Sequence, residues 1–186
     1  MIIAVVGSGG KTTLIKKLAA QYRSEGKTVL ITTTTHMFIE TDTLLTDDAA
    51  AIIHALKETG YVMAGIPDGV KINALSGETF AALRNCADVV LVEADGSKCL
   101  PLKYPNATEP VIPAHTEEII VVWGPHGLHK PAGDVCHRLE LVMQCLGITE
   151  DTVITLDHVH QLLQEGYLLP LQERYPEVRI RVYPAL

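Results

Sequence analysis

The chain lacks the features that mark several large classes of protein. None of its apolar runs approaches the ~20 residues that a membrane-spanning helix needs, and no charged segment precedes the first apolar run as in a secretory signal. Low-complexity tracts, internal repeats and linkers rich in Pro, Gly or Ser are also absent. These absences predict a single domain over residues 1–186, with no membrane partner and a cytoplasmic location.

Positive charge and paired cysteines are scarce as well. The 15 Lys and Arg residues are outnumbered by 22 Asp and Glu, which gives a formal net charge of −7. This balance argues against nucleic acid as the main partner, because nucleic-acid binding depends on clustered positive charge. The 4 cysteines are scattered, with no C-x-x-C pair, so neither a zinc site nor a disulfide framework is expected.

Apolar runs alternate with amphipathic or capped segments along the chain. The apolar runs predict strands over residues 2–6, 28–32, 88–92, 118–122 and 178–182, and a hairpin over 61–66 and 70–75. The other segments predict helices over residues 14–23, 47–57, 76–87, 134–146 and 155–165. Such alternation is typical of an α/β fold with a mainly parallel sheet, in which strand 28–32 should pair with strand 2–6.

The most informative segment joins the first strand to the first helix. The strand runs directly into Gly7-Ser8-Gly9-Gly10-Lys11-Thr12-Thr13, after which the helix begins. Glycines let backbone N–H groups approach an anion closely, and a helix N-terminus adds partial positive charge. The segment is therefore predicted to bind the phosphates of a nucleotide, with Lys11 reaching the β- and γ-phosphates and the Thr12 hydroxyl ligating Mg²⁺.

The loop departs at one place from the usual phosphate-binding pattern. The pattern G-x-x-x-x-G-K-[ST] requires glycine where this chain has Val5, so the loop is a shorter G-x-x-G-K-T-T, similar to Mur-ligase-like loops. The structural alternative is a glycine-rich turn with a chance Lys-Thr pair. The strand before and the helix after favour nucleotide binding, and they predict a P-loop NTPase-like three-layer sandwich with helices on both faces of the sheet.

A second motif follows the strand over residues 88–92. Glu93 stands where this strand leaves the sheet, and a carboxylate in that place is a candidate ligand for the Mg²⁺ of a nucleotide. Glu93 and Gly96 fit a [D/E]-x-x-G pattern, in which the glycine N–H approaches the γ-phosphate. Asp95 is a candidate catalytic residue that orients a water or accepts a substrate proton. The alternative is that these acids only form a turn after the strand.

Hydroxyl and basic side chains extend this candidate site. The run Thr32-Thr33-Thr34-Thr35 ends a strand where parallel sheets bind ligands, so Thr34 is a candidate Mg²⁺ ligand, although threonine also suits an extended edge. Lys98 and Lys103 are candidates for binding an anionic second substrate. Arg138 either contacts a transferring phosphoryl group or forms a surface pair with Glu140.

These segments together resemble the YqeC family. The resemblance covers residues 1 to about 155, and it is carried by the loop from Gly7 to Leu14, by Thr32–Thr35 and Val92–Lys98, and by 100–103, 109–113 and 137–138. It implies a P-loop protein associated with selenium-dependent molybdenum hydroxylases and with maturation of their cofactor. The implied partners are a nucleotide and either molybdenum cofactor or a molybdenum hydroxylase.

The residues and the resemblance favour one function and leave two alternatives. The leading hypothesis is a Mg²⁺-dependent accessory enzyme that hydrolyses or uses ATP or GTP in maturation of a molybdenum and selenium cofactor. One alternative is a small-molecule kinase with Asp95 as its base, and the other is a nucleotide-gated cofactor carrier or chaperone. No N-K-x-D motif selects guanine, which weakens a GTPase assignment without proving ATP.

Overall fold

Buried apolar strands form the centre of one of two units into which the chain divides. The structure is a computed structural model that describes residues 1–186. Unit 1 consists of Met1–Val5, Thr12–Ala94 and Ile112–Glu117, and unit 2 consists of Val6–Lys11, Asp95–Val111 and Glu118–Leu186. The single nucleotide-binding domain expected over residues 1–186 stays a prediction. No helix has both the length and the apolar character needed to cross a membrane.

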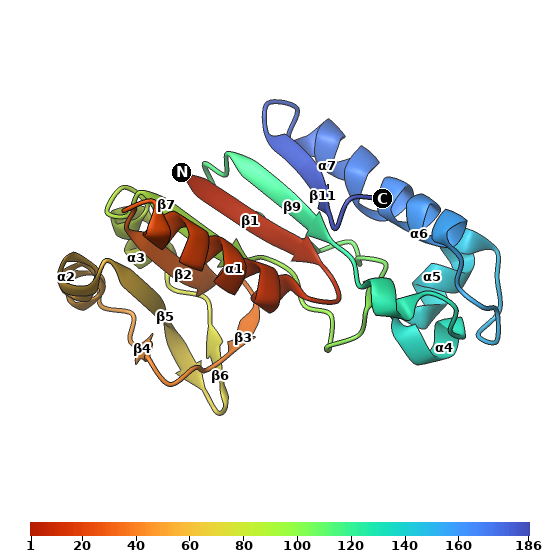
Figure 1. Cartoon of the computed structure of the whole chain (residues 1–186), viewed down its shortest axis with the longest axis horizontal. Coiled ribbons are helices and arrows are strands. Elements are labelled where there is room, and N and C mark those ends of the chain that lie inside the picture. Colours follow the sequence, from red (N-terminus) through yellow and green to blue (C-terminus); the bar gives the residue numbers. More distant parts are fainter. The chain divides into compact units, whose positions relative to one another are not determined.

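Unit 1 holds most of the strands, which Figure 1 labels. They are β1 (Ile2–Gly7), β2 (Val29–Thr33), β3 (His36–Phe38), β4 (Thr43–Leu45), β5 (Tyr61–Asp68), β6 (Lys71–Asn73) and β7 (Val89–Glu93). The helices of this unit are α1 (Lys11–Ser24), α2 (Ala49–Thr59) and α3 (Gly77–Leu83). The strands run in the order β1-β7-β2-β5-β6-β3, and β4 pairs with β5. Pairing is parallel except where β6 meets β5 and β3.

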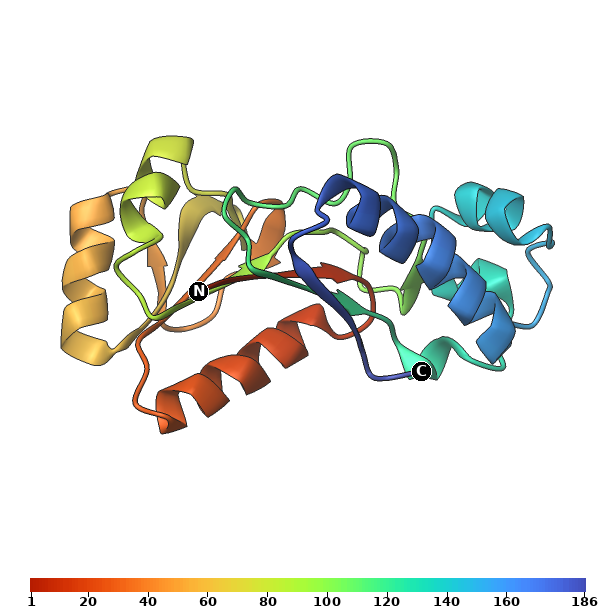
Figure 2. The ribbon, with the colours of Figure 1, turned by 90° about the horizontal axis from the view of Figure 1, so that it is seen from above.

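The central strands need cover on both faces. β1, β2 and β7 are buried along their whole length, as continuous apolar runs in a parallel sheet require. Helix α1 lies on one face of this sheet and α3 on the other (Figure 2). On α1, Leu14, Ile15 and Leu18 are buried, while Lys16 and Lys17 are exposed. The predicted mixed α/β fold with a mostly parallel sheet is confirmed.

The predicted pairing of strand 28–32 with the first strand is wrong. β7 lies between β1 and β2, with Val92 opposite Ala4 on one side and Thr32 on the other. β7 has two edges of backbone hydrogen-bonding groups and two apolar faces. A position between two strands pairs both edges, and layers above and below the sheet bury both faces. The apolar runs of the sequence do not show which strand takes the position between two others.

Local signals in unit 1 behave as the sequence predicts. Asp48 caps α2 by accepting hydrogen bonds from the next turn, and Gly60 ends it with a left-handed φ of 68°. Ser76 caps α3, which ends at Leu83 rather than near residue 87. The predicted hairpin is present as β5 and β6, with Gly69 at a φ of 59° in its turn.

Unit 2 has fewer strands and more helices. Its strands are β8 (Leu102–Lys103), β9 (Glu118–Val122), β10 (Cys136–His137) and β11 (Arg179–Tyr183), which form two parallel pairs, β8 with β10 and β9 with β11. Its helical elements are η1 (Pro125–Gly127), α4 (Ala132–Val135), α5 (Leu139–Leu146), α6 (Leu156–Leu163), η2 (Gln164–Leu168) and α7 (Leu169–Arg174). The last three follow one another without a break and form the long blue helix in Figure 1.

The helix predicted over residues 134–146 is interrupted. After the short α4 the chain enters β10, and Arg138 then takes a left-handed φ of 60° before α5 begins. Cys136 and His137 pair with Leu102 and Lys103, so bonds to β8 replace a helical turn there. The helix predicted from Thr155 starts as expected, since Thr155 and His158 form a capping box, but it continues through the π-helical η2 to Arg174.

Candidate functional site

In unit 1 the end of β7 meets the first turn of α1. Glu93, the last residue of β7, lies opposite Val5 of β1 and is only 7% exposed. The Thr12 hydroxyl donates a hydrogen bond to Glu93 Oε2 at 2.8 Å. The structure thus brings together two of the three side chains that the sequence proposes as Mg²⁺ ligands, from positions 81 residues apart.

The threonine run at the end of β2 contacts the backbone of Glu93. The Thr33 hydroxyl donates to the Glu93 carbonyl oxygen at 2.7 Å, and the Thr34 N–H donates to the same oxygen at 3.0 Å. Thr33 Oγ1 also accepts a hydrogen bond from the Thr35 N–H at 3.0 Å. Thr34, the third predicted ligand, is half-buried beside this carbonyl. Thr33 therefore fixes the strand end that carries Glu93, a role that the sequence did not single out.

No larger set of metal-binding side chains is present. No group of three or more His, Cys, Asp and Glu side chains is arranged to hold a metal ion. The Mg²⁺ prediction therefore depends on the Thr12 hydroxyl and the Glu93 carboxylate. Two protein oxygens suit this ion, which keeps several waters and takes one or two carboxylates in nucleotide sites.

The glycine loop of unit 2 has two kinds of glycine. Gly7 and Gly9 have φ angles of 88° and 66°, and a Cβ on either would collide with backbone: the Val122 carbonyl oxygen lies 2.1 Å from it at Gly7, and Gly124 lies 2.6 Å from it at Gly9. Gly10 has a φ of 117°, and a Cβ there would contact nothing within 4 Å. The first two glycines are thus required by packing, and Gly10 by its backbone conformation alone.

Polar groups at the start of the loop are already used within the protein. The Gly7 N–H donates to Asp95 Oδ2 at 3.1 Å, and the Ser8 N–H donates to the Val122 carbonyl at 2.8 Å. The Ser8 hydroxyl donates to the Pro101 carbonyl at 2.9 Å. Gly7 and Ser8 were predicted to bind phosphate, but their N–H groups and the Ser8 hydroxyl bond to oxygens of the protein.

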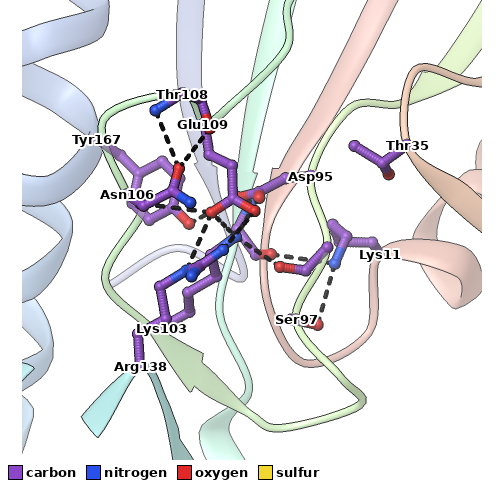
Figure 3. Close-up of polar contacts among 12 residues, drawn as sticks. Lys11, Thr35, Asp95, Ser97, Lys103, Asn106, Thr108, Glu109, Arg138 and Tyr167 are labelled. Carbon is purple, nitrogen blue, oxygen red and sulfur yellow. Dashed lines mark hydrogen bonds and ion pairs between the residues drawn. The ribbon is translucent and has the colours of Figure 1, made fainter. Parts of the chain in front are cut away.

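Lys11 folds back over the loop that precedes it. Its ammonium donates to the Gly7 carbonyl at 3.0 Å and to the Ser97 hydroxyl at 3.1 Å, and the residue is 5% exposed (Figure 3). Ser97 follows the second motif directly and was not predicted as a site residue. Its neighbour Lys98 is exposed with a left-handed φ of 48°, and Gly96 is half-buried with open space where a Cβ would lie.

Asp95 is fully buried, at 0% exposure, and accepts three hydrogen bonds. Besides the Gly7 N–H, its donors are the Lys103 ammonium at Oδ1 and the Tyr167 hydroxyl at Oδ2, the latter at 2.7 Å (Figure 3). Burial, followed by the charge of Asp95, raises the pKa of Tyr167 well above its ordinary value, so the phenol stays protonated and remains a donor. Tyr167 comes from η2, 72 residues away, and only the fold brings it to Asp95.

An alternating chain of charges continues from Asp95. Lys103 also pairs with Glu109 at 2.7 Å and donates to the Gly96 carbonyl at 2.5 Å. Arg138 donates to both oxygens of Glu109, to Oε1 at 2.8 Å and at 3.2 Å to Oε2, the oxygen that Lys103 also contacts. The chain Asp95–Lys103–Glu109–Arg138 therefore contains two negative and two positive groups. Arg138 pairs with Glu109, and not with Glu140 as the structural alternative supposed.

The pKa values reflect this arrangement. Burial acts to raise the pKa of Glu109, but hydrogen bonds from Lys103 and Arg138 outweigh it, so the pKa lies below its ordinary value. For His137, burial together with the charges of Lys103, Arg138 and Lys98 lowers the pKa. The neutral imidazole is thus favoured among these cations.

These features define an α/β protein whose glycine loop, between a buried strand and a helix, is attached to a buried carboxylate. The chain belongs to the YqeC family: the family described as YqeC protein matches residues 3–140. A protein of Escherichia coli (strain K12) named "Uncharacterized protein YqeC" is 36% identical over 172 residues, which cover 88% of this chain and 67% of that protein. No solved structure matches the chain. The predicted family is thereby confirmed.

The two kinds of glycine contact predict a difference in stability. Gly7→Ala should lower the free energy of unfolding by roughly 4 kcal/mol or more, because backbone strain adds to a collision with Val122. Gly26→Ala is the matched control, since Gly26 has a similar φ of 77° but open space around it. It should cost only about 1 kcal/mol. Urea unfolding measures both, and equal losses would contradict the collision at Gly7.

The lowered pKa of Glu109 predicts a pH-dependent stability. Ionised Glu109 stabilises the fold above its unfolded pKa of about 4.3, and this contribution disappears as the pH falls through its lower folded pKa. Stability should therefore fall on acidification, and the stability difference between wild type and Glu109→Gln should shrink. Taking this difference cancels other carboxyls with lowered pKa values, such as Asp47 and Asp88. A difference that stays constant in urea titrations from pH 6 to 3 would rule out this role.

Proposed function

We propose that this chain is a P-loop nucleotide-binding protein that uses Mg²⁺ and hydrolyses or otherwise uses ATP or GTP. The observation that carries the proposal is the 2.8 Å hydrogen bond between the Thr12 hydroxyl and Glu93. The chemistry of a Mg²⁺-nucleotide site calls for a hydroxyl after the loop lysine and a carboxylate at the end of a neighbouring strand. β7 is that neighbouring strand, since it pairs directly with β1.

The loop offers the groups that a phosphate needs. The amides of Gly7 and Ser8 are bonded to Asp95 and Val122, so the proposed cradle begins at Gly9. It consists of the backbone of residues 9–13 together with the Lys11 ammonium. These residues lead into the 14-residue helix α1, whose N-terminus adds positive potential. When bound, Mg²⁺ would neutralise phosphate charge, with Thr12 and Glu93 as its protein ligands and Thr34 as a candidate third.

The buried state of Asp95 bears on the type of reaction. A kinase that used Asp95 as its base would need this carboxylate to reach a substrate hydroxyl. Asp95 is fully buried and accepts three hydrogen bonds, which favours nucleotide hydrolysis or nucleotide-dependent partner binding over such a kinase. The place of the reaction, in maturation of a molybdenum and selenium cofactor, is proposed from the family resemblance alone. Lys98, exposed beside the loop lysine's partner Ser97, is the proposed contact for an anionic second substrate.

Two substitutions separate binding from turnover. Lys11→Ala should weaken nucleotide binding by roughly 1.5–3 kcal/mol, the value of a lost charge-assisted hydrogen bond. Glu93→Gln keeps the size of the side chain but removes a charge, so it should reduce turnover more than affinity. Calorimetric titration with Mg²⁺–ATP and Mg²⁺–GTP, together with phosphate release, measures both effects.

The control for lost charge is Lys57→Ala, which removes an exposed lysine of α2 and should leave binding unchanged. If Lys11→Ala binds nucleotide like the wild type, the glycine loop is a structural turn. If the wild type binds neither nucleotide at millimolar concentration, the proposal fails.

A further inference from the structure

We infer that Asp95 is a positioning residue for the glycine loop, and that Lys103, Glu109 and Arg138 hold it in place. The inference rests on the proposed nucleotide site and assigns to Asp95 and Arg138 a role other than direct catalysis. It is carried by hydrogen bonds within unit 2, which join the loop at Gly7 to the partly exposed side chain of Arg138 (Figure 3).

The hydrogen bonds of Asp95 indicate that it fixes the position of the glycine loop and does not transfer a proton. A general base must reach the proton that it removes, directly or through one water. Asp95 Oδ2 accepts from the Gly7 N–H and from Tyr167, and Oδ1 accepts from Lys103. With no exposed surface and donors on both oxygens, the carboxylate is directed at the protein itself.

Gly7 is held at both of its backbone polar groups. Its N–H donates to Asp95, and its carbonyl accepts from the Lys11 ammonium at 3.0 Å. The path from Asp95 to the proposed phosphate-binding lysine therefore passes through one residue. A shift of the Asp95 carboxylate would move Gly7, and with it the carbonyl that orients Lys11. Bonds to a charged acceptor are the strong ones, so Asp95 is well suited to fix this turn.

The ion chain fixes the Asp95 carboxylate in place. A buried carboxylate needs a partner, and Lys103, whose side chain has no exposed surface, is shared between Asp95 and Glu109. Arg138 bonds both oxygens of Glu109, and its side chain is 29% exposed. Arg138 thus acts on the loop through Glu109 and Lys103. A turn at Asn106, whose Oδ1 accepts from the Thr108 N–H at 3.0 Å, presents Glu109 to both cations.

Tyr167→Phe tests the inference, because it removes one hydrogen-bond donor to Asp95 from a residue that is only 1% exposed. Nucleotide Kd should rise about tenfold, equivalent to ~1.4 kcal/mol, with kcat little changed and the pH profile of kcat unmoved. Tyr104→Phe is the matched control: it removes a phenol of the same unit that does not bond to Asp95, and it should leave Kd unchanged. If Asp95 were the base, losing the Tyr167 donor would change kcat and leave Kd unaffected. That result would overturn the inference.

Two further measurements make each result decisive. Arg138→Ala should raise Kd and Arg138→Lys should restore part of the affinity, whereas an arginine that contacts the transferred phosphoryl group would lose kcat in both variants. Hydrogen exchange of the Gly7 amide, measured by NMR without nucleotide, should be about tenfold faster in Tyr167→Phe and in Arg138→Ala than in the wild type. Unchanged exchange overturns the positioning role. A wild type that binds no nucleotide but shows this difference in exchange would refute the proposed function alone.

Discussion

The buried carboxylate of Asp95 is the constraint on which the rest of unit 2 depends. A charge without exposed surface is tolerated only when hydrogen-bond donors surround it. Those donors come from three separate segments: the glycine loop supplies Gly7, β8 supplies Lys103, and η2 supplies Tyr167. Satisfying one carboxylate therefore ties the loop after β1 to a helix near the end of the chain. Lys103 also pairs with Glu109, and Arg138 pairs with Glu109 in turn, so the chain of charges that begins at Asp95 ends at Arg138.

The two acids at the end of β7, Glu93 and Asp95, bond to different groups, although one residue separates them. Glu93 ends a strand and accepts a hydrogen bond from the Thr12 hydroxyl, the pair that we propose as Mg²⁺ ligands. Asp95 accepts from an ammonium, a phenol and a backbone amide. Residue type alone does not show which groups each carboxylate bonds, because the donors come from distant segments of the chain.

Glycine in the loop serves packing, apart from the phosphate binding that we propose for it. Gly7 and Gly9 lie too close to Val122 and Gly124 for any side chain, so this pattern would be needed even if no anion approached. Gly10 has free space, and its unusual φ is the part of the loop that packing does not require. Because packing alone requires two of the three glycines, glycines by themselves are weak evidence of phosphate binding. The strand before the loop and the helix after it add the stronger evidence. The family match extends over this loop and the acidic motif, since it covers residues 3–140.

The sequence by itself determined the α/β class, most element positions and the family, because apolar runs, capping residues such as Asp48 and Thr155, and the glycine loop are local signals. It also proposed both Thr12 and Glu93 as Mg²⁺ ligands, since a helix start after a glycine loop and a strand end are local features of the sequence. Only the tertiary structure decided that β7 lies between β1 and β2, that a strand interrupts helix 134–146, and that Tyr167 and Glu109 serve Asp95. These outcomes depend on which distant groups satisfy one another's hydrogen bonds and charges, and no local pattern carries that information.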